Sequence, residues 1–363
     1  MSYHSVKLTK ILNTLPEQGL PFALYRLPGK GQVHLVAQLN GMEKFSKRNT
    51  LQPQAKGFLF APFAINQSSG TLFIPAHEHI SLHPDDLANI NLSHIAYPDF
   101  PQIQQTSETK FKQLIREAKK NIEKNIYTKI VLSRCVHINR KPTFDPLQFF
   151  RTVCTTYPHA FVSFIYSPGA GCWIGASPEV LLQYRKNIFT TYSLAGTKTS
   201  PNIPWSAKEK EEQRIVTDYL CRVMRQVTKK KPLVTAAQTV AAGNLFHLRS
   251  IVRVHTATYD SWLHLVRLIH PSPAVAGYPK AEAVQFILRH EQAPRLYYGG
   301  YLGPVNLHNE INLYVNLRCM LVGSKRLTLY AGCGITASSS PQAEWSETEN
   351  KLNTLRTILE HAT

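Results

Sequence analysis

Short apolar runs alternate with amphipathic segments from residue 107 to the end of the chain. Four runs have the length and the β-branched or aromatic content of strands: residues 129–138, 161–166, 313–321 and 327–330. Apolar residues at helical spacing predict helices over 207–227, 280–290 and 341–359, and an earlier one with Phe111, Leu114 and Ile115 on one face. This alternation predicts a mixed α and β protein.

The first 100 residues carry little chemical information. Apolar runs at 57–61 and 71–74, broken by prolines and glycines, predict strands and turns. His77, Glu78 and His79, with His83 nearby, look like a metal cluster but lack the HExxH spacing, and we interpret them as a surface loop. We expect a single domain over residues 1–363, in which 1–100 are scaffold and 105–363 carry the chemistry.

The net charge of +18 narrows the class of partner. A basic chain can bind nucleic acid, an anionic membrane surface or small anions. The densest basic run, Lys229 to Lys231, adjoins a predicted helix and lacks the interleaved aromatic residues of a single-strand binder. We therefore expect a small anionic metabolite as partner and no nucleic acid, and we keep a basic nucleic-acid-binding protein as the weaker alternative.

The sequence also indicates in which compartment of the cell the protein works. No apolar run approaches the roughly 20 residues that span a bilayer, and the first residues lack the apolar core of a secretory signal. The six cysteines are scattered without CxxC spacing, which indicates reduced thiols rather than disulfides or a zinc site. We expect a cytoplasmic protein without a membrane segment, and a monomer.

Two predicted helices carry carboxylates on faces that point toward the core. In the last helix, the apolar stripe continues backward to Lys351, Glu347 and Glu344, and in the helix over 207–227 Glu212 lies on the inward line. Acidic residues in a first turn usually lie in solvent, where they suit the helix dipole. If the two acidic ends converge, Glu212, Glu344 and Glu347 could instead hold Mg²⁺, which takes few carboxylates and several waters.

Three further segments could contribute to a site. Residues 194–197 follow a β-like run, and residues 331–335 follow a predicted strand as a nest of backbone N–H groups for an anion. Two prolines stiffen the loop 269–274 around His270. Each pattern alone is more typical of a turn, and a lone histidine is more often structural than catalytic.

Taken in order, these segments resemble the chorismate-utilising enzymes and, within them, the isochorismate synthases. The matching stretches run through the C-terminal two-thirds of the chain: Lys129 to Arg134, Gly175 to Glu179, Leu194 to Thr197, Ser206 to Glu212, His247-Leu248, His270 to Val275, Arg295 with Tyr298 to Gly300, Arg318-Cys319, Ala331 to Ile335, and Glu344 to Thr348 with Lys351. The resemblance implies an α+β fold with antiparallel-rich sheets, helices packed outside, and a cleft that binds chorismate.

The family pattern implies a role for each site residue. Lys129 would activate the attacking water, and would have to be neutral when it acts, while Glu179 would protonate the departing hydroxyl. Mg²⁺ held by Glu212, Glu344 and Glu347 would bind the ring carboxylate. The implied substrate contacts are Ala195, Gly196, Thr197, His247, Ala274, Tyr298, Arg318, Gly332, Cys333, Gly334 and Lys351.

The stretch that ends at Ala274 resembles the isochorismate synthases, since salicylate and aminating synthases often carry threonine at that position. The resemblance thus implies an isomerase that converts chorismate to isochorismate by water attack at ring C2 and loss of the C4 hydroxyl. Salicylate, anthranilate and aminodeoxychorismate synthases remain alternatives. The chain departs from the family at Gln213, commonly histidine, and at Pro304, commonly tryptophan. Isochorismate supplies menaquinone and siderophore synthesis, and we expect menaquinone as the housekeeping use.

Overall fold

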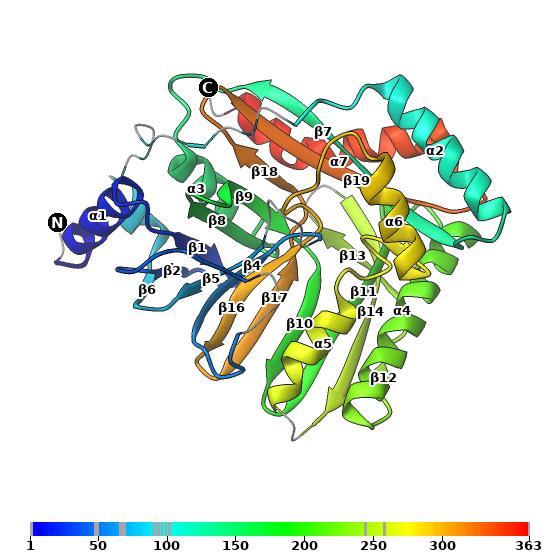
Figure 1. Cartoon of the computed structure of the whole chain (residues 1–363), viewed down its shortest axis with the longest axis horizontal. Coiled ribbons are helices and arrows are strands. Elements are labelled where there is room, and N and C mark those ends of the chain that lie inside the picture. The colour runs from blue at the N-terminus through cyan, green and yellow to red at the C-terminus, as the bar shows by residue number, and fades with distance from the viewer. Residues whose placement is uncertain are drawn as a thin grey trace.

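Two large antiparallel β-sheets organise the chain (Figure 1). The computed structural model describes residues 3–46, 51–64, 70–88, 90, 92, 95, 97–98, 100, 103–242, 245–256 and 259–361. Every strand pairing among these residues is antiparallel, and helices lie outside the sheets (Figure 1). The fold is therefore α+β, as the sequence analysis predicted.

The first sheet has nine strands. In spatial order they are β15 (Gly277–Tyr278), β7 (Lys129–Asn139), β19 (Arg326–Ile335), β18 (Cys319–Val322), β9 (Gly171–Ser177), β8 (Phe161–Ser167), β1 (Phe22–Arg26), β2 (Val33–Ala37) and β6 (Glu78–Leu82). Helices α2 (Glu108–Glu123), α3 (Pro146–Thr156) and α7 (Pro341–His361) pack on this sheet, and α2 and α3 each pack on α7.

The second sheet has ten strands. They follow the order β12 (Leu233–Val234), β14 (Leu245–His255), β11 (Ile188–Lys198), β10 (Val180–Arg185), β17 (Glu310–Val315), β16 (Tyr301–Leu307), β4 (Gly57–Ala61), β5 (Thr71–Pro75) and β3 (Lys44–Ser46), while β13 (Gln238–Ala242) also pairs with β14. Helices α4 (Ala207–Thr228) and α5 (Trp262–Ile269) pack on it. The remaining helices are α1 (Tyr3–Glu17), α6 (Lys280–His290) and the short 3-10 turns Pro84–Leu87 and Tyr259–Ser261.

Aromatic side chains fill the space between the sheets. Phe161 of β8 stacks on Tyr314 of β17 with ring centroids 4.1 Å apart, and Phe60 of β4 meets the edge of Trp173 of β9. Strands from residues 22–82 enter both sheets, so the N-terminal part contributes to this shared core. Burying such large rings is the main stabilising term available to the sandwich.

Local sequence explains where the site-bearing helices begin. Ser206 caps α4: its hydroxyl accepts from the amide of Glu209, and the Glu209 carboxylate accepts from the amide of Ser206. At α2 the Ser107 hydroxyl caps the helix by accepting from the amide of Lys110, without a reciprocal contact. All four predicted helices are confirmed, and none of the described helices has the length and apolar composition that crossing a bilayer requires.

Several predicted elements are wrong in their extent. The run 313–321 is not one strand: β17 ends at Val315, β18 begins at Cys319, and the two belong to different sheets. At the crossing the Asn316 amide donates to the carbonyl of Tyr297, and Arg318 adopts a left-handed backbone with φ of 48°. Glu78 and His79 lie in β6 rather than in a surface loop. The six cysteines are free, and five of them are buried.

Candidate active site

A narrow cavity of about 80 Å³ lies between the sheets and helices α4 and α7. Its volume corresponds to only a few water molecules. All the predicted site residues except Glu344 line it: Lys129, Glu179, Ala195, Gly196, Thr197, Glu212, His247, Ala274, Tyr298, Arg318, Gly332, Cys333, Gly334, Glu347 and Lys351. The structure therefore brings together residues that are up to 222 positions apart, from Lys129 to Lys351.

Glu179 lies between β9 and β10 on a backbone that is fixed on both sides. The Val315 amide donates to the Glu179 carbonyl at 3.0 Å, and the Ser177 hydroxyl accepts from the Glu179 amide at 3.3 Å. Burial raises the pKa of Glu179 to about 8, although Lys129 and Lys351 act in the opposite direction. A carboxyl group with this pKa is protonated at neutral pH and can donate a proton to a ligand.

Lys129 and Lys208 form ion pairs with the carboxylates that helices α4 and α7 bring to the site. The ammonium of Lys129 is almost fully buried and lies 3.4 Å from Glu212 Oε2. The ammonium of Lys208 lies 3.6 Å from Glu212 Oε1 and donates to Glu344 Oε1. Helices α4 and α7 thus bring Glu212 and Glu344 to one cation, Lys208, which sequence reasoning did not assign to the site although it lies one turn before Glu212.

The residues around Glu212 and Glu344 fit a small divalent cation. Glu344 is buried, and its Oε2 accepts no hydrogen bond of normal geometry from the described residues, although Ser339 lies nearby. A side chain at Gly334 would place its Cβ 2.5 Å from Glu212 Oε2, so the glycine keeps the space beside this oxygen open. Among the described residues no three His, Cys, Asp or Glu form a metal cluster, and Mg²⁺ does not need one because water and substrate supply most of its ligands.

Arg318 is a buried cation in the wall of the cavity. One guanidinium nitrogen donates to Thr354 Oγ1 at 3.0 Å, and the other donates to His247 Nε2 at 3.1 Å. Burial lowers the pKa of Arg318 to about 10, and no ion pair links it to a carboxylate in the described part of the chain. A buried guanidinium in this state attracts an anionic ligand, because a carboxylate would replace the solvation that it has lost.

His247 holds a defined tautomer. Because Arg318 can only donate, His247 Nε2 accepts, and Nδ1 therefore carries the proton that it donates to the carbonyl of Gly196 at 2.6 Å. Burial and the neighbouring Arg318 lower the pKa of His247 to about 3, so the ring is neutral. His247 thereby connects Arg318 to the Gly196 backbone, which has a φ of 69° and where a Cβ would lie 2.9 Å from Trp205 and 3.1 Å from Glu209.

Lys351 and Glu347 form a pair one turn apart on α7. The Lys351 ammonium donates to Glu347 Oε1 at 2.6 Å and to the Gly332 carbonyl at 2.7 Å. Burial acts to raise the pKa of Glu347, but Lys351 and Lys208 outweigh it and hold the pKa below its usual value. Glu347 is therefore ionised, and it is separated from Glu344 by less than one helical turn.

The prediction of an anion-binding nest of backbone N–H groups at residues 331–335 is wrong. These residues continue β19 to Ile335, where they pair with β7 from Ile130 to Arg134. The neighbour on the other side, β18, pairs only as far as Leu329. Gly332, Cys333 and Gly334 therefore contribute one edge of a strand to the cavity, not a loop that follows a strand.

Arg295 and Glu291 form a buried ion pair at the wall of the cavity. Of the two, only Arg295 lies in one of the stretches that resemble the family. Both are buried, and the Arg295 guanidinium donates to both oxygens of Glu291. Arg295 also donates to the carbonyls of Val131 and Val275, and Glu291 accepts from the amide and hydroxyl of Ser133. This pair therefore ties the strand that carries Lys129 to the loop that carries Ala274.

Gln213, one of the departures from the family pattern, faces away from the carboxylates. Its amide donates to Ser250 Oγ at 2.8 Å and to Thr217 Oγ1 at 2.9 Å, so it joins α4 to β14. Pro304, the other departure, lies within β16 opposite Phe58. Neither residue lines the cavity.

Comparison with known proteins identifies the family of the chain. The sequence profile of the family described as "Chorismate binding enzyme" matches residues 76–360. Isochorismate synthase EntC of Escherichia coli K12 is 27% identical over 262 residues, which cover 69% of this chain and 67% of that protein.

Two solved structures share the fold over nearly the whole chain. The DhbC protein of Bacillus anthracis superposes with a TM-score of 0.77 at 20% identity, and the alignment covers 98% of this chain and 99% of that one. MenF, the menaquinone-specific isochorismate synthase of Escherichia coli, gives a TM-score of 0.72 at 22% identity over 95% and 90% of the two chains. At these identities the likeness shows the fold.

Proposed function

Because the chain belongs to the chorismate binding enzyme family, we propose that it is an isochorismate synthase, an isomerase that converts chorismate to isochorismate. The relatives named isochorismate synthase support this reaction over others of the family. The observation that carries the proposal is that Glu179, whose pKa burial raises to about 8, lines the same cavity as Lys129 and the buried Arg318.

The reaction needs a proton acceptor and a proton donor. Water adds at ring C2 and loses a proton, while the C4 hydroxyl leaves and gains one, so the overall change is an isomerisation. We assign the acceptor role to Lys129, which would have to be the neutral amine when it accepts the proton. We assign the donor role to Glu179, whose raised pKa keeps its carboxyl protonated at neutral pH. Lys351 and Lys129 lie close enough to Glu179 to stabilise the carboxylate that it becomes.

The two carboxylates of the substrate would meet two cationic regions. Arg318 and Lys351 suit the enolpyruvyl carboxylate, since no carboxylate of the described residues forms an ion pair with the buried Arg318 and Glu347 acts on it only from farther away. Glu212, Glu344 and Glu347 would hold Mg²⁺, which would bind the ring carboxylate and offset negative charge. His247, neutral and fixed by Gly196, orients the Arg318 guanidinium.

Ala274 supports water addition without a further elimination. It lines the cavity beside Val275, whose carbonyl accepts from Arg295. Its methyl group leaves room and adds no hydroxyl that could direct later steps. Salicylate synthase and the aminating synthases stay as alternatives of the same fold. We further propose a cytoplasmic monomer that serves menaquinone synthesis, while siderophore synthesis is the other use that the relatives' names suggest.

One incubation separates these activities. The purified protein is supplied with chorismate and Mg²⁺, without ammonia, and the products are resolved by chromatography. We expect isochorismate as the primary product. Salicylate and pyruvate as primary products, or a requirement for ammonia, would overturn the proposal, and salt-sensitive binding of DNA or RNA with no effect on chorismate would favour the nucleic-acid alternative.

A further inference from the structure

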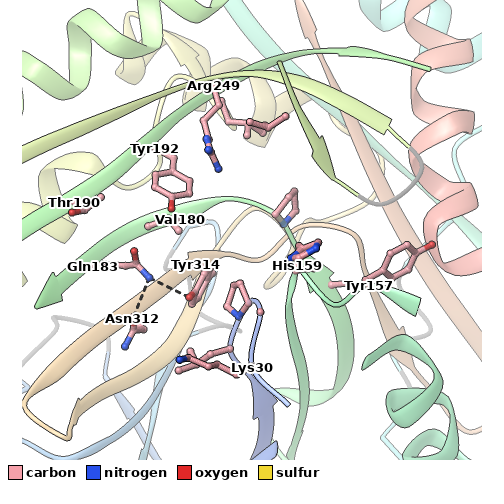
Figure 2. Close-up of a pocket in the computed structure, with 18 of the residues that line it drawn as sticks. Lys30, Tyr157, His159, Val180, Gln183, Thr190, Tyr192, Arg249, Asn312 and Tyr314 are labelled. Atoms are coloured by element: carbon pink, nitrogen blue, oxygen red, sulfur yellow. Dashed lines mark hydrogen bonds between the residues drawn. The ribbon is translucent and has the colours of Figure 1, made fainter. Parts of the chain in front are cut away.

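A second, much larger cavity of about 1040 Å³ adjoins the catalytic one (Figure 2). The two share a wall formed by Pro178, Leu194 and Arg318. The catalytic cavity, at about 80 Å³, is smaller than the roughly 300 Å³ at which small-molecule pockets begin, so its wall has to move when a substrate binds. The larger cavity lies directly behind that wall.

The larger cavity is strongly basic. Six cationic side chains line it, Lys30, Arg185, Lys186, Arg249, Arg253 and Arg318, against the single carboxylate of Glu310. Glu310 is already paired with Arg185 at 2.8 Å. Within the described part of the chain, no ion pair links Arg249, Arg253 or Lys186 to a carboxylate. The cavity therefore has an uncompensated positive charge.

The arginines are arranged in order along one sheet. Alternate residues of β11, from Ile188 through Thr190 and Tyr192 to Leu194, line the cavity, because side chains on a strand repeat every second residue. On the adjacent strand β14, Arg253 pairs with Thr190 near the exposed end, and Arg249 pairs with Leu194 at the shared wall.

Burial of the cations increases along the same direction. Arg253 is exposed, Arg249 is half-buried with its guanidinium 5.0 Å from the Tyr192 ring centroid, and Arg318 is buried in the wall. Figure 2 shows Arg249 and Tyr192 pointing into the space that Gln183 of β10 and Tyr314 of β17 also face from the same sheet. An anion moving inward meets cations that are progressively less screened by solvent.

We propose that this cavity captures small dicarboxylates and is the route by which the substrate reaches the catalytic cavity. The proposal rests on the proposed function, because it takes chorismate as the dianion. Arg253 and Arg249 raise the local concentration of the anion and so its rate of association, as charged clefts with apolar walls do. Neither residue touches the catalytic cavity, so neither affects the chemical step.

The test uses the double variant Arg249→Gln/Arg253→Gln and a control that loses the same charge elsewhere, Lys230→Gln/Lys231→Gln, which lies in the exposed segment after α4. Stopped-flow tryptophan fluorescence reports chorismate binding, since Trp205 lies close to Gly196, which lines the catalytic cavity. Association rates and kcat are measured at ionic strengths of about 0.01 M and about 1 M, where the Debye length falls from roughly 30 Å to roughly 3 Å.

We expect the cavity variant to associate about tenfold more slowly than the control at low ionic strength, with kcat unchanged and the difference lost at high ionic strength. Equal association rates for the cavity variant and the control overturn the capture route while the proposed function stands, provided that the wild-type protein forms isochorismate. A wild-type protein that neither binds nor converts chorismate overturns both. Equal thermal midpoints for the two variants show that the fold is intact.

Discussion

The ammonium of Lys129 lies 3.4 Å from Oε2 of Glu212, so the proposed base contacts a proposed metal ligand. Glu212 also faces Lys208, which in turn donates to Glu344. The proposed base and the proposed cation site therefore share one carboxylate, Glu212, so a change at either site alters the contacts of the other.

We expect Lys129→Met, which keeps the length of the buried side chain, to lower turnover by at least about 100-fold, because proton transfer to a positioned base contributes about that much. Product formation from chorismate measures the effect. The far-ultraviolet circular dichroism spectrum should match that of the wild type. A variant that retains near-normal turnover would show that another group accepts the proton.

Helical periodicity was sufficient to predict much of this site. The inward phase of two helices placed Glu212, Glu344 and Glu347 at the ends of apolar stripes, and α4 and α7 bring the first two to one cation. Lys208 lies four residues before Glu212 on the same face of α4, so the same periodicity could have identified it. The roles assigned to Lys129 and Glu179 came from family resemblance and stay predictions.

What periodicity could not predict depends on long-range pairing. The run 313–321 is continuously apolar or uncharged up to Arg318, yet the chain changes sheets there, because Asn316 bonds to the Tyr297 carbonyl and Arg318 takes a left-handed backbone. This crossing is what places Arg318 between the sheets. Similarly, β19 continues through two glycines because β7 pairs with it as far as Ile335.

Arg318→Gln should raise the KM for chorismate by about 10- to 100-fold, because a charge-assisted contact to a carboxylate is lost. We expect little change in thermal stability, since the variant removes the cost of burying a cation, and this gain offsets the lost hydrogen bonds to Thr354 and His247. Steady-state kinetics and a thermal melt measure the two effects. An unchanged KM together with a lower melting temperature would assign Arg318 a structural role only.

Glu291→Gln should destabilise the fold by about 3 kcal/mol, because it leaves the buried Arg295 without its counter-charge. The double variant Glu291→Leu/Arg295→Met should recover much of that stability. We expect kcat to stay low in the double variant, since its ties to Val131, Ser133 and Val275 are gone. Urea unfolding and steady-state kinetics provide the comparison, and a double variant with wild-type kcat would contradict this positioning role.

Chelation should abolish activity, and added Mg²⁺ should restore it, if the carboxylates of α4 and α7 hold the cation. We expect Glu344→Gln to raise the Mg²⁺ concentration that gives half-maximal activity, because one of the few carboxylate ligands is lost. Glu211→Gln, on the exposed side of α4 next to Glu212, is the control and should not shift that concentration. Full activity of the wild type after exhaustive chelation would exclude a required cation.

Glu179→Gln should separate catalysis from stability, because burial raises the Glu179 pKa from 4.5 to about 8. The unfolded chain releases this proton near pH 4.5, whereas the folded protein keeps it up to about pH 8. The contribution of the neutral Glu179 carboxyl to the free energy of unfolding is therefore fully present below pH 4.5. It is lost progressively as the pH rises to about 8. Glutamine does not ionise, so its folded state escapes this loss.

We accordingly expect Glu179→Gln to be inactive at every pH, yet more stable than the wild type by roughly a few kcal/mol at about pH 9 and equally stable at about pH 4. In the wild type, kcat/KM should fall as the pH rises through about 8, because the donor loses its proton. Urea unfolding at the two pH values tests the stability, with the exposed Glu123→Gln as control. If the free energies of unfolding of the variant and the wild type change in parallel with pH, Glu179 does not hold its proton in the folded protein, and the donor must lie elsewhere.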